Sequence, residues 1–593
     1  MEGRRAEQLL LVTFCALAVI PLLYLGRASD TNTFTSWRWV LSPSGLLRVF
    51  SLLVPCLLCA FALSRLELSG NAASAALFVA SFASALPLWL EPEAIIDASR
   101  YFVQAKSLEE NGVGYFLGEW GRRIPAWTDL PLVPFLDGLV FSWIGEERTY
   151  IQALNTLLFA LTVVLTSLIG KRIWDEETGL HAGLLLLGIP YLLTQVPLLL
   201  VDVPTLFFLT LSIYLFILAL EKGGGALLCA SSGAIFLAIL SKYSTWPMLL
   251  LIPITAVVRM RNKPRLTAAR AFGVMLMTGL LAGAMLYARY DLVREQLMLL
   301  RTYQWSGLSR WHEGFVSTFL FQTHPFVTGL ALYGIYRAVR ERDIRFLIAG
   351  WFVIFIVLLQ VRRIRYIVPL FPLFSLMASY GLNRLRDARV RRYISLCAVA
   401  SSLVIAYTAF LPFLRSTSMA NLGQAGKFLD TLDCRSVRVY ALPQGNSSGS
   451  TFAAIPLLDY HTRKRIISPQ EWPGHPDDGD TRRSSLRFTW EARRPDLFAP
   501  DGKDDGCAVA VISDTVPVRL PVEAAGKEGS LLREAGRFDR TSGVFKYQTM
   551  VTVYTKDGLS QTGQKYYPVV PIGTMSCLPC VEGLRQFAAN PSY

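Results

Sequence analysis

Charged residues are scarce in this chain. They make up 17% of its 593 residues, whereas a soluble enzyme normally carries about 25%. Hydrophobic residues make up 52%, and many stand in uninterrupted runs that approach the ~20 residues needed to cross a bilayer. The sequence therefore excludes an ordinary soluble enzyme and predicts a polytopic α-helical membrane protein.

Two further features are missing from the sequence. We find no internal repeat, which weighs against a transporter, because transporters are often built from inverted repeats with broken helices at mid-membrane. We also find no soluble face of basic and aromatic residues, which weighs against nucleic-acid binding despite the net charge of +14. The basic residues instead cluster in short loops between apolar runs, as the positive-inside rule predicts for cytoplasmic loops.

Thirteen apolar runs are candidate membrane spans, and about eleven remain if some are half-spans. They lie near residues 8–26, 46–64, 73–90, 148–170, 179–197, 203–221, 225–241, 245–258, 268–287, 314–336, 344–360, 366–382 and 393–413. With the first residue in the cytoplasm, every short basic loop falls inside, and the loop 91–147 and the tail after 413 fall outside. We expect the first span to be an uncleaved anchor, because no small-residue cleavage site follows it. A prokaryotic plasma membrane is favoured over the endoplasmic reticulum.

The polar residues 414–593 predict a small extracytoplasmic α/β domain. Short apolar runs at 437–442, 508–513 and 550–555 are typical of strands, and residues 423–432 of a helix. The expected organisation is an added pair of spans in 1–72, a membrane core in 73–413 with the outer loop 91–147, and this tail domain.

Four of the nine cysteines, Cys434, Cys507, Cys577 and Cys580, lie in the tail, and the other five lie in apolar runs. An even number in an oxidising compartment predicts up to two disulfides. Cys577 and Cys580 can instead form a redox or metal pair, although no histidine is close in sequence.

The most informative polar residue is Asp97, which follows an apolar run and opens the long outer loop. The loop carries several aromatic residues, among them Tyr101, Trp120 and Trp127. A carboxylate at a membrane face with an aromatic loop behind it suggests chemistry on a membrane-borne substrate. The alternatives are a solvated carboxylate at a helix end and an aromatic belt at the interface.

Asp202, in Leu200-Val-Asp202-Val-Pro204, lies between two spans at the same outer face. Carboxylates in membrane segments are costly and usually functional. The alternative is a helix cap before Pro204, and both roles can hold together.

Cations also lie at this outer face, where the charge bias disfavours them. They are Lys242 and the cluster Arg362, Arg363 and Arg365, which is followed by Tyr366. A phosphate at the membrane surface explains them, because arginine offers a bidentate fork and lysine a compact charge. The alternatives are ion pairs with Asp97 and Asp202, or lipid head groups.

These segments, in this order and on this side, resemble the GT-C superfamily of integral-membrane glycosyltransferases. The similar branch contains the protein O-mannosyltransferases and the lipid A aminoarabinose transferases, and the resemblance covers roughly residues 73–413. It rests on Asp97, on the Pro131/Pro134 segment, on Arg148 before a span ending Gly170-Lys-Arg172, and on the Asp202, Lys242 and Arg365 segments.

The resemblance implies a mannosyltransferase-like enzyme with a polyprenyl- or dolichyl-phosphate sugar as donor and a protein, lipid or glycan as acceptor. Asp97 is then the general base for the acceptor hydroxyl, and Asp202 positions the acceptor or tunes Asp97. Lys242, Arg365, Tyr366 and Arg362 bind the donor phosphate. Tyr101, Trp120 and Trp127 belong to the acceptor loop, and the tail covers the outer mouth and helps to choose the acceptor. The expected outcome is inversion by direct displacement.

The chain departs from the family pattern at two places. Ala98 stands where a second acid often follows the first, and Leu130-Pro131 stands where a Pro-Pro pair is expected. The absent second acid weighs mildly against a metal-dependent oligosaccharyl or phosphoryl transferase, so we expect no required cofactor, although a divalent metal is not excluded. A transporter or flippase and a non-catalytic glycan-assembly factor remain as the other classes.

Overall fold

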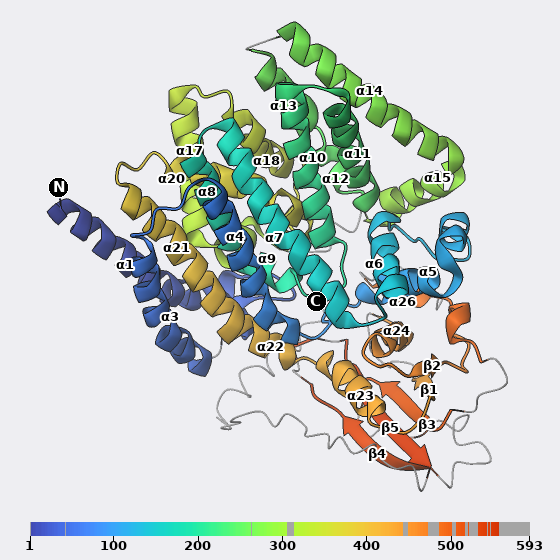
Figure 1. Ribbon diagram of the computed structural model, residues 1–593. Helices are drawn as coiled ribbons and strands as arrows, with labels where there is room; N and C mark the ends of the chain where they lie inside the picture. The colour runs from blue at the N-terminus through green and yellow to red at the C-terminus, as the bar shows by residue number, and fades with distance from the viewer. Residues whose placement is uncertain are drawn as a thin grey trace.

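The computed structural model describes most of the chain at the level of secondary structure. The described residues are 2–41, 43–261, 264–304, 313–442, 449–472, 486–500, 506–515, 520, 532–541, 544–545 and 547–556. Figure 1 shows a bundle of long helices, with a sheet and its short helices at one end. The protein is a polytopic helical membrane protein with a C-terminal domain that contains a sheet.

Within the described residues, eight helical segments are long and apolar enough to cross a membrane. They are α1 (Glu2–Leu25), α3 (Pro43–Leu63), α4 with the turn after it (Gly70–Leu90), α7 (Arg148–Ile173), α10 (Asp202–Lys222), α14 (Pro264–Ala288), α19 (Ile364–Ile367) continued by α20 (Phe371–Leu382), and α21 (Ala388–Ile405) continued by α22 (Leu411–Arg415).

The remaining helices are shorter or more polar and fill the spaces between and beside the long ones. They are α2 (Trp37–Val40), α5 (Ala98–Glu119), α6 (Leu132–Trp143), α8 (Glu176–Leu187), α9 (Pro190–Gln195), α11 (Gly225–Ser241), α12 (Thr245–Met248), α13 (Leu251–Met260), α15 (Tyr290–Leu299), α17 (Pro325–Glu341), α18 (Phe346–Leu359), α23 (Ala420–Asp430), α24 (Ile455–Asp459) and α26 (Arg487–Glu491).

Several predicted spans are not single helices; the run 245–258, for example, divides into α12 and α13. The run 179–197 divides into α8 and α9, because Gly188 ends the first, Ile189 is extended and Pro190 opens the second; proline disfavours a helical conformation at the residue before it. The run 314–336 is divided by an extended residue, His324, whose ring accepts a hydrogen bond from the backbone N–H of Phe326 at the start of α17. The residues on both sides of each break are apolar. The sequence alone therefore predicts a continuous span at each place.

Close backbone contact joins α17 to α20, the helix that follows the Arg365 segment. A Cβ added to Gly334 would lie 2.3 Å from the carbonyl oxygen of Met377, and one added to Gly381 would lie 2.3 Å from that of Leu330. Such distances leave no room for a methyl group, so the two helices can meet only because both residues are glycine.

Replacing Gly334 with alanine is therefore expected to lower the midpoint of thermal unfolding, with a cost of about 1–3 kcal/mol from overpacking. Gly329 is the matched control, because it lies on the same helix and a Cβ added there would meet nothing within 4 Å. Thermal unfolding of the two variants in the same detergent measures the difference. Equal midpoints would show that the α17–α20 contact is not tight.

Basic loops meet at one end of the bundle. Arg172 and Arg259 both pair with Glu221, at 3.0 and 2.8 Å, although they lie in the last turns of different helices, α7 and α13. Glu221 lies in the last turn of α10, whereas Asp202 begins that helix, and a helix of 21 residues is about 30 Å long. The predicted basic loops therefore lie about 30 Å from the Asp202 end.

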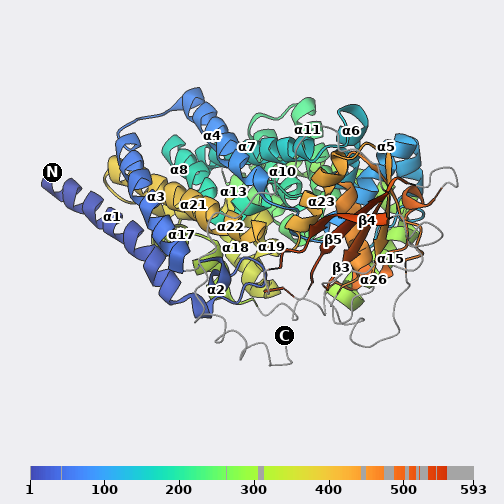
Figure 2. The same cartoon turned by 90° about the horizontal axis from the view of Figure 1, so that it is seen from below.

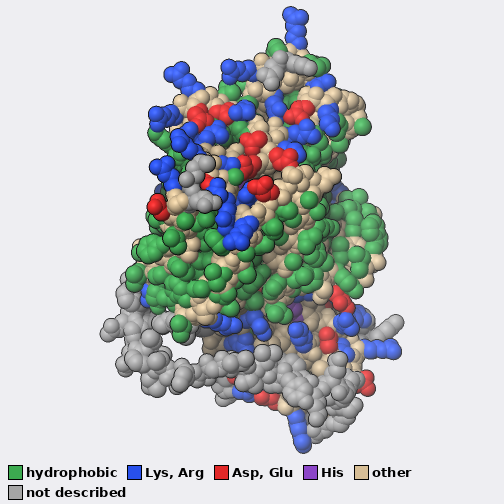
Figure 3. All heavy atoms as spheres, turned by 60° about the vertical axis from the view of Figure 1, so that its left-hand side comes forward, with side chains coloured by type: hydrophobic (Ala, Val, Ile, Leu, Met, Phe, Trp, Pro, Cys, Tyr) green, Lys and Arg blue, Asp and Glu red, His purple; other side chains and the backbone are tan. Residues whose placement is uncertain are grey.

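A band of hydrophobic side chains lies on the surface of the bundle between these two ends. Figure 3 shows it as a green band, with charged side chains gathered above and below. Leu280 and Phe272 of α14 are among the exposed members, at 66% and 67%. Such a large exposed apolar surface is unstable in water and fits the hydrocarbon core of a membrane.

The N-terminal helices pack on the rest of the bundle. α1 and α3 both contact α21, and the loop between them is fastened by the buried Asp30. The carboxylate of Asp30 accepts hydrogen bonds from the backbone N–H of Trp37 at 2.6 Å, from the amide of Gln322 at 3.1 Å and from the hydroxyl of Ser317. The added spans predicted from the sequence are thus joined to the core at the end where the Arg365 segment lies.

The C-terminal domain contains a five-stranded sheet with the order β2-β1-β3-β5-β4. The strands are β1 (Ser436–Ala441), β2 (Arg465–Ile467), β3 (Ala508–Ser513), β4 (Leu532–Phe538) and β5 (Met550–Lys556). β2, β1 and β3 run parallel, and β5 and β4 join them in antiparallel pairing. The three strands and the helix predicted from the sequence are present as β1, β3, β5 and α23.

The sheet domain and the outer loop share one hydrophobic core. It includes Phe102 of α5, Phe141 of α6 and Tyr460 after α24, with the ring centroids of Phe102 and Tyr460 5.2 Å apart. Figure 2 shows the sheet beside α5 in a second view. Because these elements pack on one another, the domain is held directly over the segment that begins with Asp97.

Candidate functional site

Glu93 fixes the segment that precedes Asp97. Its buried carboxylate accepts a hydrogen bond from the backbone N–H of Leu199 at 2.8 Å and pairs with Arg148 at 3.3 Å. Arg148 also donates to the carbonyl oxygen of Trp89 at 3.3 Å. The end of α4, the start of α7 and the loop before α10 are thereby joined around residues 91–97.

Asp97 lies directly before α5 and lines a cavity of about 190 Å³. Its side chain makes no capping hydrogen bond to the helix that it precedes, so the carboxylate is available for other contacts. About one fifth of that side chain, 21%, is exposed. The predicted alternative of an ordinary carboxylate at a helix end does not describe this position, because Asp97 faces two arginines.

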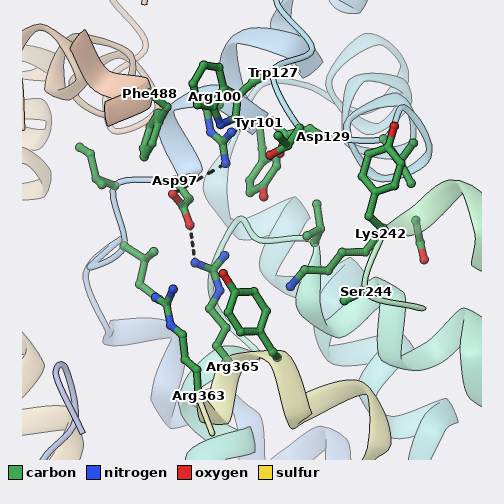
Figure 4. Close-up of a pocket in the computed structure, with 18 of the residues that line it drawn as sticks. Asp97, Arg100, Tyr101, Trp127, Asp129, Lys242, Ser244, Arg363, Arg365 and Phe488 are labelled. Atoms are coloured by element: carbon green, nitrogen blue, oxygen red, sulfur yellow. Dashed lines mark hydrogen bonds and ion pairs between the residues drawn. The ribbon is translucent and has the colours of Figure 1, made fainter. Parts of the chain in front are cut away.

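Arg365 joins the two aspartates found from the sequence. Its guanidinium pairs with Asp97 through Nη1 and with Asp202 through Nε, the latter at 2.8 Å. Figure 4 shows Arg365 below Asp97 with a dashed line between them. One planar cation thus bridges residues that are far apart in the chain, as the fork of arginine allows.

Lys242 completes the contacts of Asp202. Its ammonium lies 2.6 Å from Asp202 and 5.6 Å from the ring centroid of Tyr366. The Asp202 side chain is fully buried and is not part of the cavity wall, whereas Lys242, Arg365 and Tyr366 are. Asp202 is the first residue of α10, and its carboxylate pairs with both cations and so positions them from behind the cavity wall.

Arg100 and Asp129 form a second ion pair that the sequence did not indicate. Arg100 lies 3.2 Å from Asp129 and 3.7 Å from Asp97. Asp129 also accepts a hydrogen bond from Gln104 at 3.2 Å. The spacing of three residues between Asp97 and Arg100 on one helix was the available signal, but the loop that brings Asp129 was not predictable.

A polar chain links this pair to α15. Gln296 donates to the backbone carbonyl of Asp129 at 2.8 Å, and the hydroxyl of Tyr243 donates to the side-chain oxygen of Gln296. Tyr243 follows Lys242 in the sequence. The loop that carries Asp129 and the loop that carries Lys242 are therefore fixed against the same helix.

The aromatic residues predicted for the outer loop divide into two groups. Tyr101 and Trp127 line the cavity. Trp120 does not line it but packs against Phe116, with their ring centroids 5.0 Å apart. Phe488 of α26 also lines the cavity, and no signal in the sequence marked it, because it lies nearly 400 positions after Asp97.

Only part of the arginine cluster 362–365 lines the cavity. Arg363 and Arg365 line the cavity, and Arg363 lies 5.3 Å from the ring centroid of Tyr366. Arg362 is not in the cavity wall, and its guanidinium lies 5.5 Å from the ring centroid of Phe315. The structure thus brings together all predicted phosphate-binding residues except Arg362.

The electrostatics of the cavity favour an ionised Asp97. Burial by itself would raise its pKa, but the charges of Arg365 and Arg100 lower that pKa below its usual value. Burial raises the pKa of Tyr101 well above its usual value, and the nearby charge of Asp129 raises it further. At neutral pH Asp97 is therefore an anion and Tyr101 a neutral hydroxyl.

The structure describes two of the four tail cysteines. Cys434 and Cys507 form a disulfide that joins the loop before β1 to the start of β3. Cys577 and Cys580 lie outside the described residues. Within the described part of the chain, no group of three or more His, Cys, Asp or Glu side chains is arranged to hold a metal ion, and the expectation that no cofactor is required stays a prediction.

Part of the chain matches a known family. The model of the dolichyl-phosphate-mannose-protein mannosyltransferases matches residues 128–287. This stretch contains Asp202 and Lys242 but not Asp97 or Arg365, which the fold brings to the same place. No curated protein matches the chain significantly in sequence.

Solved structures resemble a larger part of the chain. ArnT from Cupriavidus metallidurans bound to undecaprenyl phosphate matches with a TM-score of 0.51 at 14% identity, and the match covers 81% of this chain and 97% of that one. The archaeal oligosaccharyltransferase AglB from Archaeoglobus fulgidus, in complex with an inhibitory peptide and a dolichol-phosphate, matches with a TM-score of 0.46 at 12% identity over 74% of this chain and 69% of that one. The chain therefore has the fold of ArnT, and part of it resembles the dolichyl-phosphate-mannose-protein mannosyltransferases, which agrees with the resemblance to the GT-C superfamily of integral-membrane glycosyltransferases found in the sequence.

Proposed function

We propose that the protein transfers a sugar from a polyprenyl-phosphate donor to an acceptor hydroxyl at the extracytoplasmic face of the membrane. The observation that carries the proposal is the cavity in which the carboxylate of Asp97 and the cations Lys242 and Arg365 face one another. ArnT, which has a similar fold, is bound to undecaprenyl phosphate. That observation supports a lipid phosphate as part of the donor.

The charges of the site suit a phosphate. Four cations, Arg100, Lys242, Arg363 and Arg365, line the cavity, and the carboxylates that pair with them in and behind its wall are Asp97, Asp129 and Asp202. The donor phosphate binds Arg365 and Lys242, and Asp202 keeps these two cations in place. Fixed cations stabilise the negative charge that grows on the phosphate as it leaves.

The reaction is a direct displacement with inversion. Asp97 accepts the proton of the acceptor hydroxyl as the acceptor oxygen forms a bond to the anomeric carbon. The bond from that carbon to the phosphate oxygen breaks, and its electron pair leaves with the polyprenyl phosphate. The phosphate is already a good leaving group, so the site needs no strong general acid.

Donor binding also sets the strength of the base. Without donor, Arg365 pairs with Asp97 and keeps its pKa low, which makes it a weak base. A donor phosphate binds the guanidinium of Arg365 and weakens its ion pair with Asp97, so the pKa of Asp97 rises in the complex. The base is then strengthened only when a donor is in place.

This exchange of partners predicts a pH effect. Because Asp97 must be unprotonated, the rate falls as the pH drops below its pKa. In the free enzyme that pKa is depressed, so the acid limb of kcat/KM is expected below about pH 4, whereas the acid limb of kcat, which reports the complex, is expected at a higher pH. Steady-state rates across the acid range measure both limbs. If the acid limb of kcat lies at the same pH as that of kcat/KM, or at a lower pH, the proposed exchange of partners by Arg365 is contradicted.

The proposed activity is tested with the full-length protein in lipid nanodiscs. A panel of radiolabelled polyprenyl-phosphate sugars is supplied with crude membrane acceptors, and both transfer and donor hydrolysis are measured. We expect at least one donor to be consumed with release of polyprenyl phosphate. If the folded protein consumes none of them, a transporter or a non-catalytic assembly factor becomes the better interpretation.

A further inference from the structure

A second cavity adjoins the first on its outer side. Its volume is about 110 Å³, and it lies between α5, the loop before α6, and segments 453–456, 472 and 488–495 of the C-terminal domain. Arg100, Trp127 and Phe488 line both cavities. The wall between the two cavities is therefore made of these three side chains.

Arg100 connects this wall to Asp97. Its guanidinium lies 4.4 Å from the ring centroid of Phe488 and 3.7 Å from the carboxylate of Asp97. Figure 4 shows Asp97 with Arg365 on one side and with Arg100 and Phe488 on the other. The carboxylate thus lies where the cation-rich cavity meets the wall of the second cavity.

We propose that the second cavity binds the acceptor and that the acceptor is a carbohydrate. The inference rests on the proposed function. In a direct displacement the nucleophile and the leaving group lie on opposite sides of the anomeric carbon. If the phosphate lies at Lys242 and Arg365, the acceptor oxygen approaches Asp97 from the Arg100 and Phe488 side, and the second cavity opens there.

The lining of this cavity suits a sugar ring. Trp127, Trp472 and Phe488 supply flat apolar faces, against which the C–H face of a pyranose can stack. Gln104 and Glu491 are also in the lining, and they add planar amide and carboxylate groups that can hydrogen-bond ring hydroxyls. Predominantly apolar walls with a few polar groups are typical of small-ligand sites.

A peptide acceptor fits this lining less well. Extended peptides gain affinity by adding to an exposed strand edge, where the backbone supplies paired donors and acceptors. The described residues that line the second cavity belong to α5, α24, α26 and the loops and turns beside them, and none belongs to the five strands. Side-chain stacking is therefore the main source of binding here, and it favours rings over an extended backbone.

The test uses two opposite changes to the cavity in the full-length protein in nanodiscs. Phe488→Ala removes a stacking face, and Ala492→Trp fills the cavity from its half-buried rim. Ala499→Trp is the matched control, because Ala499 is equally half-buried in the same segment and is outside the lining. The acceptor probes are benzyl glycosides of glucose, galactose, mannose and N-acetylglucosamine, compared with serine- and threonine-containing peptides.

We expect at least one benzyl glycoside to accept sugar. Phe488→Ala is expected to raise its KM roughly tenfold, which corresponds to the loss of one stacking contact. Ala492→Trp is expected to raise the same KM at least as much, because the indole occupies the cavity. In Ala492→Trp, whose position lines the second cavity and not the first, the KM of the donor and the rate of its hydrolysis by water stay within twofold of the wild type. Ala499→Trp changes neither KM. A variant that only unfolds would instead lower donor hydrolysis as well.

The outcomes separate the inference from the proposed function. Unchanged glycoside KM values in both variants, with donor hydrolysis present, would overturn the assignment of the cavity, and transfer to peptides alone would overturn the carbohydrate class. A wild-type protein that neither hydrolyses nor transfers any donor contradicts the proposed function. In that event, crosslinking of diazirine-bearing benzyl glycosides still tests whether the second cavity binds a carbohydrate. Labels within 486–495 that Ala492→Trp abolishes support this assignment, and labels elsewhere overturn it.

Discussion

Replacing Asp97 with asparagine is expected to reduce the rate of sugar transfer by about 10²–10⁴-fold, the range typical of a lost general base. Asparagine keeps the size of the side chain but cannot accept the proton of the acceptor hydroxyl. The fold is expected to survive, because Arg365 keeps its contact with the buried Asp202 at 2.8 Å. Radiolabelled transfer by the variant and the wild type, at saturating donor, measures the loss.

The same variant separates catalysis from donor binding. Donor affinity is expected to stay equal or to increase, because the variant removes a negative charge that competes with the phosphate for Arg365. Equilibrium binding of the labelled donor to the variant provides this measurement. Retention of more than roughly one tenth of the wild-type rate would show that another group acts as the base.

Replacing Arg365 with alanine has the second large expected effect. We expect kcat/KM to fall by about 10²–10³-fold, as when one fixed donor to a developing anion is lost. The variant also leaves the buried Asp202 with only Lys242 as a partner, and breaking a buried ion pair costs about 3–5 kcal/mol. Arg365→Lys is expected to recover part of the stability but little activity, since the compact ammonium of lysine lacks the planar fork through which arginine contacts both carboxylates in a fixed geometry.

Arg362 provides a matched control for this experiment. It is three residues away and carries the same charge, but it lies outside the cavity wall beside Phe315. Arg362→Ala is expected to change stability by less than about 0.5 kcal/mol, as for most surface positions, and to leave kcat/KM within about threefold. A comparable loss in both variants would mean that general positive charge, and not the bridge at Arg365, is what the reaction requires.

Much of the fold was predictable because membranes impose simple rules. A span must be long and apolar, and short basic loops mark one side, so the helical bundle and the polar tail could be inferred from residue order. Two of the spans that were predicted as continuous are divided at Gly188–Pro190 and at His324. Hydropathy does not record such breaks, because the residues on both sides remain apolar.

The candidate site was predictable to a similar degree. Asp97, Asp202, Lys242 and Arg365 were noticed because each places a charge where the surrounding sequence is apolar or where the side of the membrane disfavours it. Arg100, Asp129 and Phe488 carry no such signal. They lie in polar segments where a charged or aromatic residue is ordinary, and only their positions around the cavity distinguish them.

The sequence by itself determined that the chain is a membrane protein, that its basic loops gather on one side and that unusual charges lie on the other. These properties follow from the cost of placing each residue type in hydrocarbon, which depends on local composition. The tertiary structure alone decided which charges meet: Arg365 between Asp97 and Asp202, Arg100 beside Asp129, and Phe488 of the distant tail at the wall of the cavity. Ion pairs and cavity walls form over a few ångströms between segments far apart in the chain, so they depend on packing and not on residue order.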